Sequence, residues 1–383
     1  MKIAMLTPYF YPHTGGTEKY VKDLSIQLTK FGHEITVFSC NVPKKAGAKA
    51  EETIEGGIKV RRLPAVDIVY LPVTMVFDKK MLAGFDIAHA HCPPFGFVRS
   101  LAGKINIPLV VTYHCDTTMS EKFFGLPMPK FVIDSVENST NGYAKTLLPK
   151  VNAIISTSQT YASTSPVLKN FKPNIVPIGV HYEQFDAVMK KIGISEESRR
   201  PNQVLFLGRL AANKGVDYLI KAVPKVLEKF PDTHFIITGE GEEKAPLMKL
   251  IRKLKVEKYI SFYGKISLEI LVHLYATSTM FVLPSINRLE AFGIVQLEAM
   301  ACSTPVICTD IPGPNSVMEV GKSGLLVPPR NSGALADAII ELLSNPEKAR
   351  AMGRRGRELI ETKYNWAAIG RQVEGIYKGL LSK

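Results

Sequence analysis

Two glutamates flank a glycine in the stretch 285–301, and these residue types could bind a ligand that carries phosphate and hydroxyl groups. The short apolar run before it, residues 279–283, predicts a buried strand. From Gly293 onward, apolar residues recur at helical spacing. Glu290 is therefore expected in the loop before a helix, and Glu298 one to two turns inside that helix.

The start of this predicted helix suits a phosphate group. Its first backbone N–H groups have no partner within the helix and carry a partial positive charge. Gly293 lets the backbone approach a ligand closely, and the carboxylates of Glu290 and Glu298 accept hydrogen bonds from sugar or ribose hydroxyls. The pattern favours a sugar-nucleotide site. The alternative is one solvated loop carboxylate and one surface helix carboxylate.

Two cations, Arg209 and Lys214, lie in the glycine-flanked loop 208–215, at the end of another predicted strand, residues 203–208. Arginine can grip a phosphate through two parallel hydrogen bonds, and lysine acts as a point charge. Two loop cations taken alone usually face solvent. The helix start at Gly293, which suits phosphate, is expected near these two cations. Together they favour a diphosphate site.

A glycine pair, Gly15 and Gly16, separates a first predicted strand, residues 3–7, from a helix expected from Glu18 to Lys30. Backbone N–H groups in such a turn can face an anion, although a glycine pair before a helix is also common turn chemistry. The spacing does not match G-x-G-x-x-G, which disfavours a dinucleotide cofactor.

Three histidines fall in or after predicted strands of the first half. His114 ends the strand 108–115, where ligands of open α/β sheets bind; the alternative is a surface histidine at a strand end. His89 and His91 share one strand face and could form a metal pair, but no third ligand is evident, so no metal site is expected. A Cys115 nucleophile is disfavoured.

Length and composition indicate a two-domain globular chain. At 383 residues it is too long for one ordinary core. It has no apolar run of the ~18 residues that a membrane span needs and no signal-peptide shape at its start. Its five cysteines form no C-x-x-C pair, which fits a reducing compartment. We expect a soluble, cytoplasmic protein, with membrane association as an alternative left open.

The net charge of +13 is spread over the whole chain. Residues 1–180 hold 20 Lys and Arg against 13 Asp and Glu, and the remainder holds 28 against 22. Such an excess favours anionic partners such as diphosphates or acidic lipid headgroups. Nucleic acid is not expected as a partner, because no recognised binding motif accompanies the charge.

Buried strands alternate with amphipathic helices in both halves, which predicts an α/β fold. Two Rossmann-like β/α/β domains would face a central cleft that holds the active site. The polar stretch 181–201 is interpreted as the connection between them. Residues 119–150 are either an amphipathic segment that meets an acceptor or a membrane, or a helix packed on its own domain.

Five motifs in order resemble those of the retaining glycosyltransferases of family 4, which have the GT-B fold. The chain is similar to phosphatidylinositol mannosyltransferase-like and other glycosyl transferase group 1 enzymes over nearly its whole length. The motifs are Gly15-Gly16-Thr-Glu-Lys-Tyr-Val, Thr112-Tyr-His114, Gly208-Arg209…Lys214-Gly215, Glu290-x7-Glu298 and Gly324-Leu-Leu-Val-Pro-Pro329. Two places depart from the family pattern: Pro177-Ile-Gly-Val-His181 replaces Pro-Asn-Gly-Val-Asp, and Ser303 stands where glycine is common.

The resemblance implies roles for individual residues. Arg209 and Lys214 would hold the donor diphosphate, Glu290 would face the transferred sugar, and Glu298 would bind the ribose. His114 would lie beside the sugar and the attacking hydroxyl. The implied catalytic residues are His114, Arg209, Lys214 and Glu290. The implied donor-binding residues are Gly15, Gly16, Arg209, Lys214, Lys265, Ile266, Glu290, Ala291, Phe292, Gly293, Ile294, Val295 and Glu298.

The resemblance further implies the domain limits and the reaction. Residues 1–181 would form the acceptor-side domain, with helix 366–383 packed back on it, and residues 182–365 the nucleotide-sugar domain. A sugar would pass with retention from a nucleoside diphosphate sugar to a hydroxyl of a sugar or lipid-linked acceptor, without metal or cofactor. A lipid-linked acceptor would bring peripheral contact with an anionic membrane. Alternatives on the same fold are a sugar-nucleotide epimerase, a phosphorylase or a non-catalytic binding protein.

Overall fold

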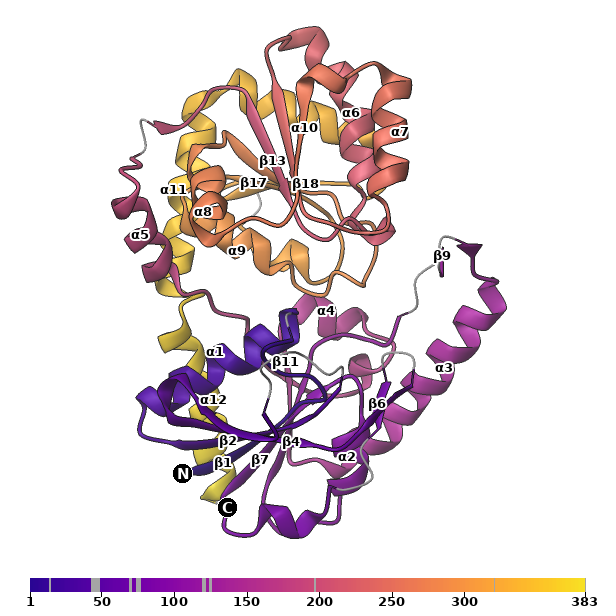
Figure 1. Ribbon diagram of the computed structural model, residues 1–383, viewed down its shortest axis with the longest axis vertical. Helices are drawn as coiled ribbons and strands as arrows, with labels where there is room; N and C mark the ends of the chain where they lie inside the picture. Colours follow the sequence, from indigo (N-terminus) through magenta and orange to yellow (C-terminus); the bar gives the residue numbers. More distant parts are fainter. Residues whose placement is uncertain are drawn as a thin grey trace. The chain divides into compact units, whose positions relative to one another are not determined.

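A computed structural model describes residues 1–13, 15–42, 49–68, 71–73, 77–118, 122–123, 126–195, 198–319 and 321–382 (Figure 1). The chain divides into two compact units. The first unit consists of Met1–Met119, Asp134–Ile178 and Trp366–Lys383, and the second of Ser120–Ile133 and Gly179–Asn365. Each unit is built on its own parallel sheet with helices packed against it, so both are α/β structures.

The first unit holds an eight-stranded sheet in the order β12-β11-β8-β7-β1-β2-β4-β3. All neighbouring strands are parallel except β3 and β4. The central strands β7 and β8 are buried along their whole length because both faces of the sheet are covered. The strands are β1 (Lys2–Leu6), β2 (Glu34–Cys40), β3 (Glu51–Ile54), β4 (Ile58–Leu63), β7 (Ile87–Cys92), β8 (Leu109–Tyr113), β11 (Ala153–Ser156) and β12 (Asn174–Ile175).

The second unit holds a six-stranded sheet in the order β15-β14-β13-β16-β17-β18, parallel throughout. The strand order reverses between β13 and β16, which is the pattern of a doubly wound sheet. The strands are β13 (Gln203–Leu207), β14 (His234–Thr238), β15 (Ile260–Tyr263), β16 (Met280–Leu283), β17 (Val306–Thr309) and β18 (Gly324–Val327).

Helices cover the sheets and two short ladders complete the described structure. The ladders pair β5 (Val66–Ile68) with β6 (Leu71–Val73), and β9 (Lys122–Phe123) with β10 (Leu126–Pro127). The helices are α1 (Gly16–Lys30), α2 (Gly96–Leu101), α3 (Lys130–Leu147), α4 (Gln159–Thr164), α5 (Tyr182–Lys191), α6 (Val216–Lys229), α7 (Lys244–Leu254), α8 (Leu268–Thr277), α9 (Ile294–Ala301), α10 (Ser332–Ser344), α11 (Pro346–Thr362) and α12 (Trp366–Leu381).

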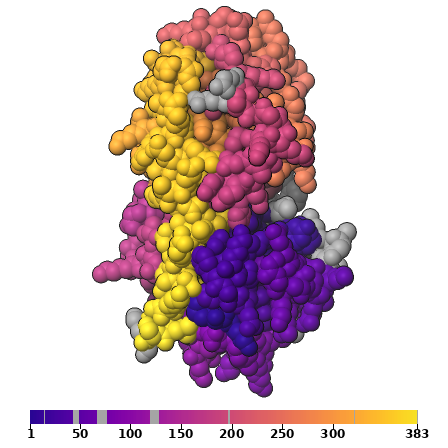
Figure 2. Space-filling model, turned by 90° about the vertical axis from the view of Figure 1, so that its left-hand side faces the viewer, coloured from indigo at the N-terminus to yellow at the C-terminus, as the bar shows by residue number. Residues whose placement is uncertain are grey.

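The last helix, α12, packs against α1 in the first unit. Figure 2 shows this yellow C-terminal segment lying along the indigo N-terminal part of the chain. Trp366, Ile369, Val373 and Tyr377 form its buried face. At Gly370 the two helices come so close that a Cβ would lie 2.7 Å from Gln27 Cγ. The end of the chain is therefore part of the core of the unit that contains its beginning.

Two sequence interpretations need comment. The stretch 181–201, interpreted as a plain connection, contains the ten-residue helix α5, whose single buried residue is Phe185. The predicted amphipathic segment 119–150 lies partly outside the described residues. Within its described part, α3 exposes Phe131 and buries Asn141, Ala144 and Leu147 near its end. Within the described part of the chain, no helix combines the length and apolar character that a membrane crossing requires.

Candidate active site

The loops that follow β13 and β16 leave the second sheet at the same edge. From this point the sheet continues through β14 and β15 on one side and through β17 and β18 on the other. Ligands of open α/β sheets bind outside the carboxyl ends of the strands at such a switch point. Lys214 belongs to the first loop and Glu290 to the second, so two predicted site residues come to this edge.

Lys214 and Glu290 form an ion pair that joins the two loops. Lys214 Nζ donates to Glu290 Oε2, and Ser285 Oγ donates to the same carboxylate oxygen at 3.1 Å. The Glu290 side chain is 11% exposed and that of Lys214 is 22% exposed. Each charge has lost most of its water and is compensated by the other. Removal of either partner would leave the second charge without compensation.

Gly215 makes this arrangement possible. Its φ of +63° is in the left-handed region, and a Cβ here would lie 2.1 Å from the backbone oxygen of Pro284. Both features require glycine. The adjacent Ile286 N–H donates to Asn213 O at 2.9 Å, which ties the two loops together through their backbones. The close approach holds Lys214 beside the carboxylate.

The start of α9 lies just beyond Glu290. Gly293 precedes the helix with a φ of +79°, and a Cβ on it would lie 2.6 Å from Gln296 Nε2. That amide nitrogen donates to the backbone oxygens of Phe292 and Pro314, at 3.3 Å each, and so fixes the turn. The helix start places backbone N–H groups and a partial positive charge next to the ion pair, an arrangement suited to phosphate.

Glu298 lies in the second turn of α9 and is 8% exposed. Tyr275 of α8 donates its hydroxyl to Glu298 Oε2 at 3.3 Å. Burial raises the pKa of Tyr275, and the negative charge of Glu298 raises it further. The phenol therefore remains a hydrogen-bond donor at physiological pH. It orients a carboxylate that is predicted to bind ribose.

Arg209 has a different environment. Its side chain is 71% exposed and pairs with Glu242 at 3.1 Å. Lys265 is also exposed and Ile266 is half-buried, both in the segment after β15. The remaining predicted donor-binding residues of this unit border the ion pair and the helix start; Ala291, Ile294 and Val295 are half-buried and Phe292 is buried.

The predicted glycine turn of the first unit contains a carboxylate. Gly15 precedes α1, and a Cβ on it would lie 2.3 Å from Glu18 Oε2. Glu18 also pairs with His13 at 3.3 Å. Burial raises the pKa of Glu18, and His13 partly offsets that effect. Gly16 is the first residue of α1 and is exposed.

His114 lies in a buried cluster of the first unit. Its Nε2 is 3.1 Å from His91 Nδ1, and the two rings stack with centroids 5.4 Å apart. The edge of the Tyr20 ring covers His114 at a centroid distance of 5.0 Å. His89 joins the cluster to α12, because its Nδ1 lies 2.6 Å from the Tyr377 hydroxyl. His114 is thus a buried residue and not a surface histidine.

Burial keeps these histidines neutral. It lowers the pKa of His89 and of His114 to about 3, and it holds the pKa of His91 well below its ordinary value. Burial also raises the pKa of the Cys115 thiol to about 12, which disfavours a thiolate nucleophile. Among the described residues, no group of three His, Cys, Asp or Glu side chains is arranged to hold a metal ion.

Sequence reasoning missed several partners of the predicted residues. Ser285 and Tyr275 orient the two site glutamates, and His91 contacts His114. The H-x-H spacing of residues 89–91 places both histidines on one strand face but does not indicate which residue of the next strand they meet. The parallel register places His91 opposite Thr112, and His114 follows two residues later on the same face.

Comparison with known proteins agrees with this architecture. Residues 14–183 match the sequence model of glycosyltransferase family 4, and residues 189–359 match that of the glycosyl transferases group 1. The chain is 26% identical to the phosphatidyl-myo-inositol mannosyltransferase of Mycolicibacterium smegmatis, over 99% of this chain and 94% of the relative.

Two solved structures share the fold. Sucrose-phosphate synthase from Thermosynechococcus elongatus superposes with a TM-score of 0.78 at 22% identity, covering 100% of this chain and 99% of the other. Anabaena HepE, in complex with UDP, superposes with a TM-score of 0.73 at 18% identity, covering 99% and 100%. The fold is GT-B, and the chain belongs to the glycosyltransferases of family 4.

Proposed function

We propose that this glycosyltransferase moves a sugar from a nucleoside diphosphate sugar to a hydroxyl acceptor with retention of configuration. The observation that carries the proposal is the convergence of Lys214, Ser285 and Glu290 with the start of α9 at the switch point of the second sheet. This edge combines a cation, helical N–H groups and a carboxylate, which are the groups that a sugar diphosphate needs.

The donor would exchange partners with the ion pair. Its diphosphate would bind Lys214 and the backbone of residues 292–295, and Glu290 would then accept hydrogen bonds from the sugar hydroxyls. Glu298 would accept from the ribose. Arg209 would turn from Glu242 to the diphosphate, a change that costs little because exposed ion pairs contribute little to stability. The UDP complex of HepE, which has the same fold, supports a nucleotide ligand.

The chemistry would depend on charge that develops during the reaction. When the bond from the sugar to the diphosphate breaks, negative charge grows on the leaving oxygens. A cation and N–H donors already fixed at that position stabilise the transition state more than the ground state, which is what accelerates a reaction. We assign His114 to contact with the transferred sugar and Gly16 to the acceptor side of the site. Joint action of these two residues with the residues of the second unit remains a prediction.

The acceptor is either a sugar or a lipid headgroup. The net charge of +13 favours an anionic surface, and Phe131 on α3 is 75% exposed. Co-sedimentation with vesicles of anionic lipid, at low and at high salt, distinguishes the two. Salt-sensitive binding would support a lipid acceptor, and absence of binding would favour a soluble sugar as the acceptor.

No metal is assigned a role, since Lys214 and the helix start would supply the positive charge. Transfer should therefore persist in excess chelator, and complete loss there would contradict this assignment.

The test of the function begins with thermal-shift titrations of UDP, GDP and ADP, followed by their sugar conjugates. A rise in Tm with one nucleotide is expected and would name the donor base. The second step measures release of nucleoside diphosphate with and without acceptor. Acceptor-dependent release supports transfer. Donor conversion without acceptor would indicate an epimerase, and binding without any release a non-catalytic protein.

A further inference from the structure

His114 presents only one ring nitrogen for new contacts. Its Nε2 is occupied by His91 Nδ1, whereas its Nδ1 has no partner among the described residues and is not sealed from solvent. The protonation of that outward nitrogen decides whether His114 donates or accepts a hydrogen bond. It is set by the proton shared with His91, because each neutral imidazole carries one proton on one of its two nitrogens.

The surroundings of His91 select one of the two arrangements. His91 Nε2 is buried, and it has no hydrogen-bond partner within the described part of the chain. If His114 donated to His91, then His91 would carry its proton on Nε2 and bury an unpaired N–H. In the opposite arrangement His91 donates from Nδ1, and only a bare lone pair is buried at Nε2. Unpaired buried N–H groups are rarer than under-satisfied acceptors.

The neighbouring contacts keep the pair neutral and fixed. Tyr20 covers both rings edge-on, at 5.0 Å from His114 and 5.7 Å from His91. His89 lies beside His91 with ring centroids 4.5 Å apart and is held by the hydroxyls of Thr112 and Tyr377, at 2.7 and 2.6 Å. Burial disfavours a positive charge on any of the three adjacent rings, so His91 and His114 both remain neutral imidazoles.

We infer that His91 is a positioning residue whose Nδ1–H donates to His114 Nε2, fixing His114 as the Nδ1–H tautomer that donates a hydrogen bond to a substrate hydroxyl oxygen. The hydrogen bond to a substrate hydroxyl rests on the proposed function. The tautomer has a chemical consequence: with Nε2 occupied and Nδ1 protonated, His114 acts as a donor and does not remove a proton from the acceptor.

The first test reads the tautomers directly in the intact chain. Histidine labelled with ¹⁵N gives long-range ¹H–¹⁵N correlations that distinguish protonated from bare ring nitrogens, and His114→Gln assigns the signals of His114. At neutral pH we expect a protonated Nδ1 and a bare Nε2 on both His91 and His114. A protonated Nε2 on His114 would overturn the inference, whatever the activity of the protein.

The second test separates position from mere stability. His91→Asn keeps an N–H donor at the place of Nδ1, whereas His91→Leu removes it. We expect His91→Leu to lower kcat by about 10-fold to 100-fold with little change in donor KM, and His91→Asn to recover most of that loss. His33→Leu is the matched control: this histidine is in the same unit, bonded to Glu374 at 3.0 Å, and its loss should leave kcat unchanged.

The two tests keep the inference and the function separate. Equal loss of kcat in His91→Asn and His91→Leu would contradict the donor role of His91. The expected tautomers together with full activity in His91→Leu would confirm the hydrogen bond but refute its use in transfer. If His91→Leu does not fold, as judged by Trp366 fluorescence, the tautomer measurement on the wild-type chain still tests the hydrogen bond from His91 to His114. Failure of every nucleotide to bind would refute the proposed function and leave the tautomer result standing.

Discussion

Lys214 is the residue on which the proposed chemistry most depends. Lys214→Ala removes the half-buried cation that would face the leaving diphosphate, and we expect turnover to fall by about 10²–10³, the usual cost of losing one preorganised donor. Measurement of kcat with saturating donor, alongside circular dichroism to verify the fold, tests this. Lys221→Ala is the control, because it removes an equal charge from an exposed pair with Asp217. Activity within a few-fold of wild type in Lys214→Ala would refute the role.

The histidine cluster makes the first unit sensitive to acid. The pKa of His89 and of His114 falls to about 3 in the folded state, and that of His91 is also lowered, whereas unfolded histidine titrates near 6.5. The unfolded chain therefore binds more protons below pH 6.5, so stability is complete above that pH and is lost as pH falls. Each histidine contributes a slope of about 1.4 kcal/mol per pH unit.

Trp366 allows this slope to be measured in the first unit. It is the only tryptophan of the chain and lies buried beside Tyr20, with ring centroids 5.6 Å apart. We expect denaturant midpoints followed by Trp366 fluorescence to fall steeply between pH 6.5 and pH 5, a range above most carboxylate titration. A flat profile over this range would show that the cluster is protonated without unfolding.

Residue types and spacing predict which residues belong to the site better than they predict the contacts that those residues make. Glu290, Gly293 and Glu298 were predicted to surround a strand-to-helix turn, and the structure places them there. Two features could not be predicted. The pairing of Arg209 with Glu242 depends on which loops meet after folding, and the contact of His91 with His114 depends on the register of β7 against β8.

At the scale of elements, α9 is held at its C-terminal end by two arginines. Arg199 donates to the backbone oxygens of Ser278, Cys302 and Ser303, at 2.7, 3.4 and 3.0 Å, and so caps both α8 and α9. Arg357 donates to Ala301 O at 2.7 Å. Cations at the negative end of a helix stabilise it. These contacts fix the helix whose other end is proposed to bind the diphosphate.

Arg199→Ala should therefore affect both stability and binding. It removes the arginine donor from the carbonyls of Ser278, Cys302 and Ser303, of which Cys302 O keeps a bond from Thr304 Oγ1 at 3.4 Å, and we expect the second unit to lose about 2–4 kcal/mol of unfolding free energy. The Tm shift on nucleotide binding should also shrink, since α9 would no longer be held in place. Hydrogen exchange of the α9 amides, measured with and without nucleotide, reports both effects. Unchanged exchange would show that Arg357 suffices to hold the helix.

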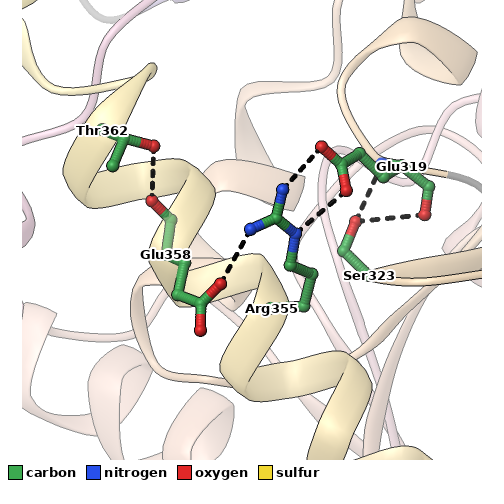
Figure 3. A network of polar contacts seen from close by, with 5 residues as sticks. All are labelled: Glu319, Ser323, Arg355, Glu358 and Thr362. Carbon is green, nitrogen blue, oxygen red and sulfur yellow. Dashed lines mark hydrogen bonds and ion pairs between the residues drawn. The ribbon is translucent and has the colours of Figure 1, made fainter.

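Arg355 provides the matched control for this prediction. Figure 3 shows it in α11 between Glu319 and Glu358, with contacts of 2.8 to 2.9 Å. Its side chain is 40% exposed, and exposed ion pairs contribute little to stability. Arg355→Ala removes the same type of side chain but should leave α9 exchange unchanged. If Arg355→Ala lowered the unfolding free energy as much as Arg199→Ala does, the effect would not be specific to the capped helix ends.

Apolar periodicity was sufficient to predict most strands and helices, because buried strands and amphipathic helices carry the strongest patterns. It missed α5, where Phe185, Val188 and Met189 recur at helical spacing, because the surrounding stretch is rich in charged residues and only Phe185 is fully buried. The reversal of strand order at β13 and β16 is a tertiary property. The alternation of strands and helices predicted a Rossmann-like sheet, but not the strands between which its order reverses.

At the scale of the whole molecule, the end of the chain stabilises the unit in which the chain begins. α12 contributes Tyr377 to the histidine cluster and packs its small residue Gly370 against α1. Two glycines of this helix offer a matched test. A Cβ on Gly370 would lie 2.7 Å from Gln27 Cγ and 2.9 Å from the Phe31 ring, whereas one on Gly375 would meet nothing within 4 Å.

The same substitution should consequently have opposite effects at these two positions. Gly375→Ala should stabilise the first unit by up to about 1 kcal/mol, because alanine favours a helix over glycine. Gly370→Ala gains the same propensity but pushes α12 away from α1, so we expect a net loss of about 1–3 kcal/mol, as in other overpacked cores. Denaturation followed by Trp366 fluorescence measures both. Stabilisation by Gly370→Ala would show that α12 does not need this close approach, and its packing would then depend on the apolar face and the bond from Tyr377 to His89 alone.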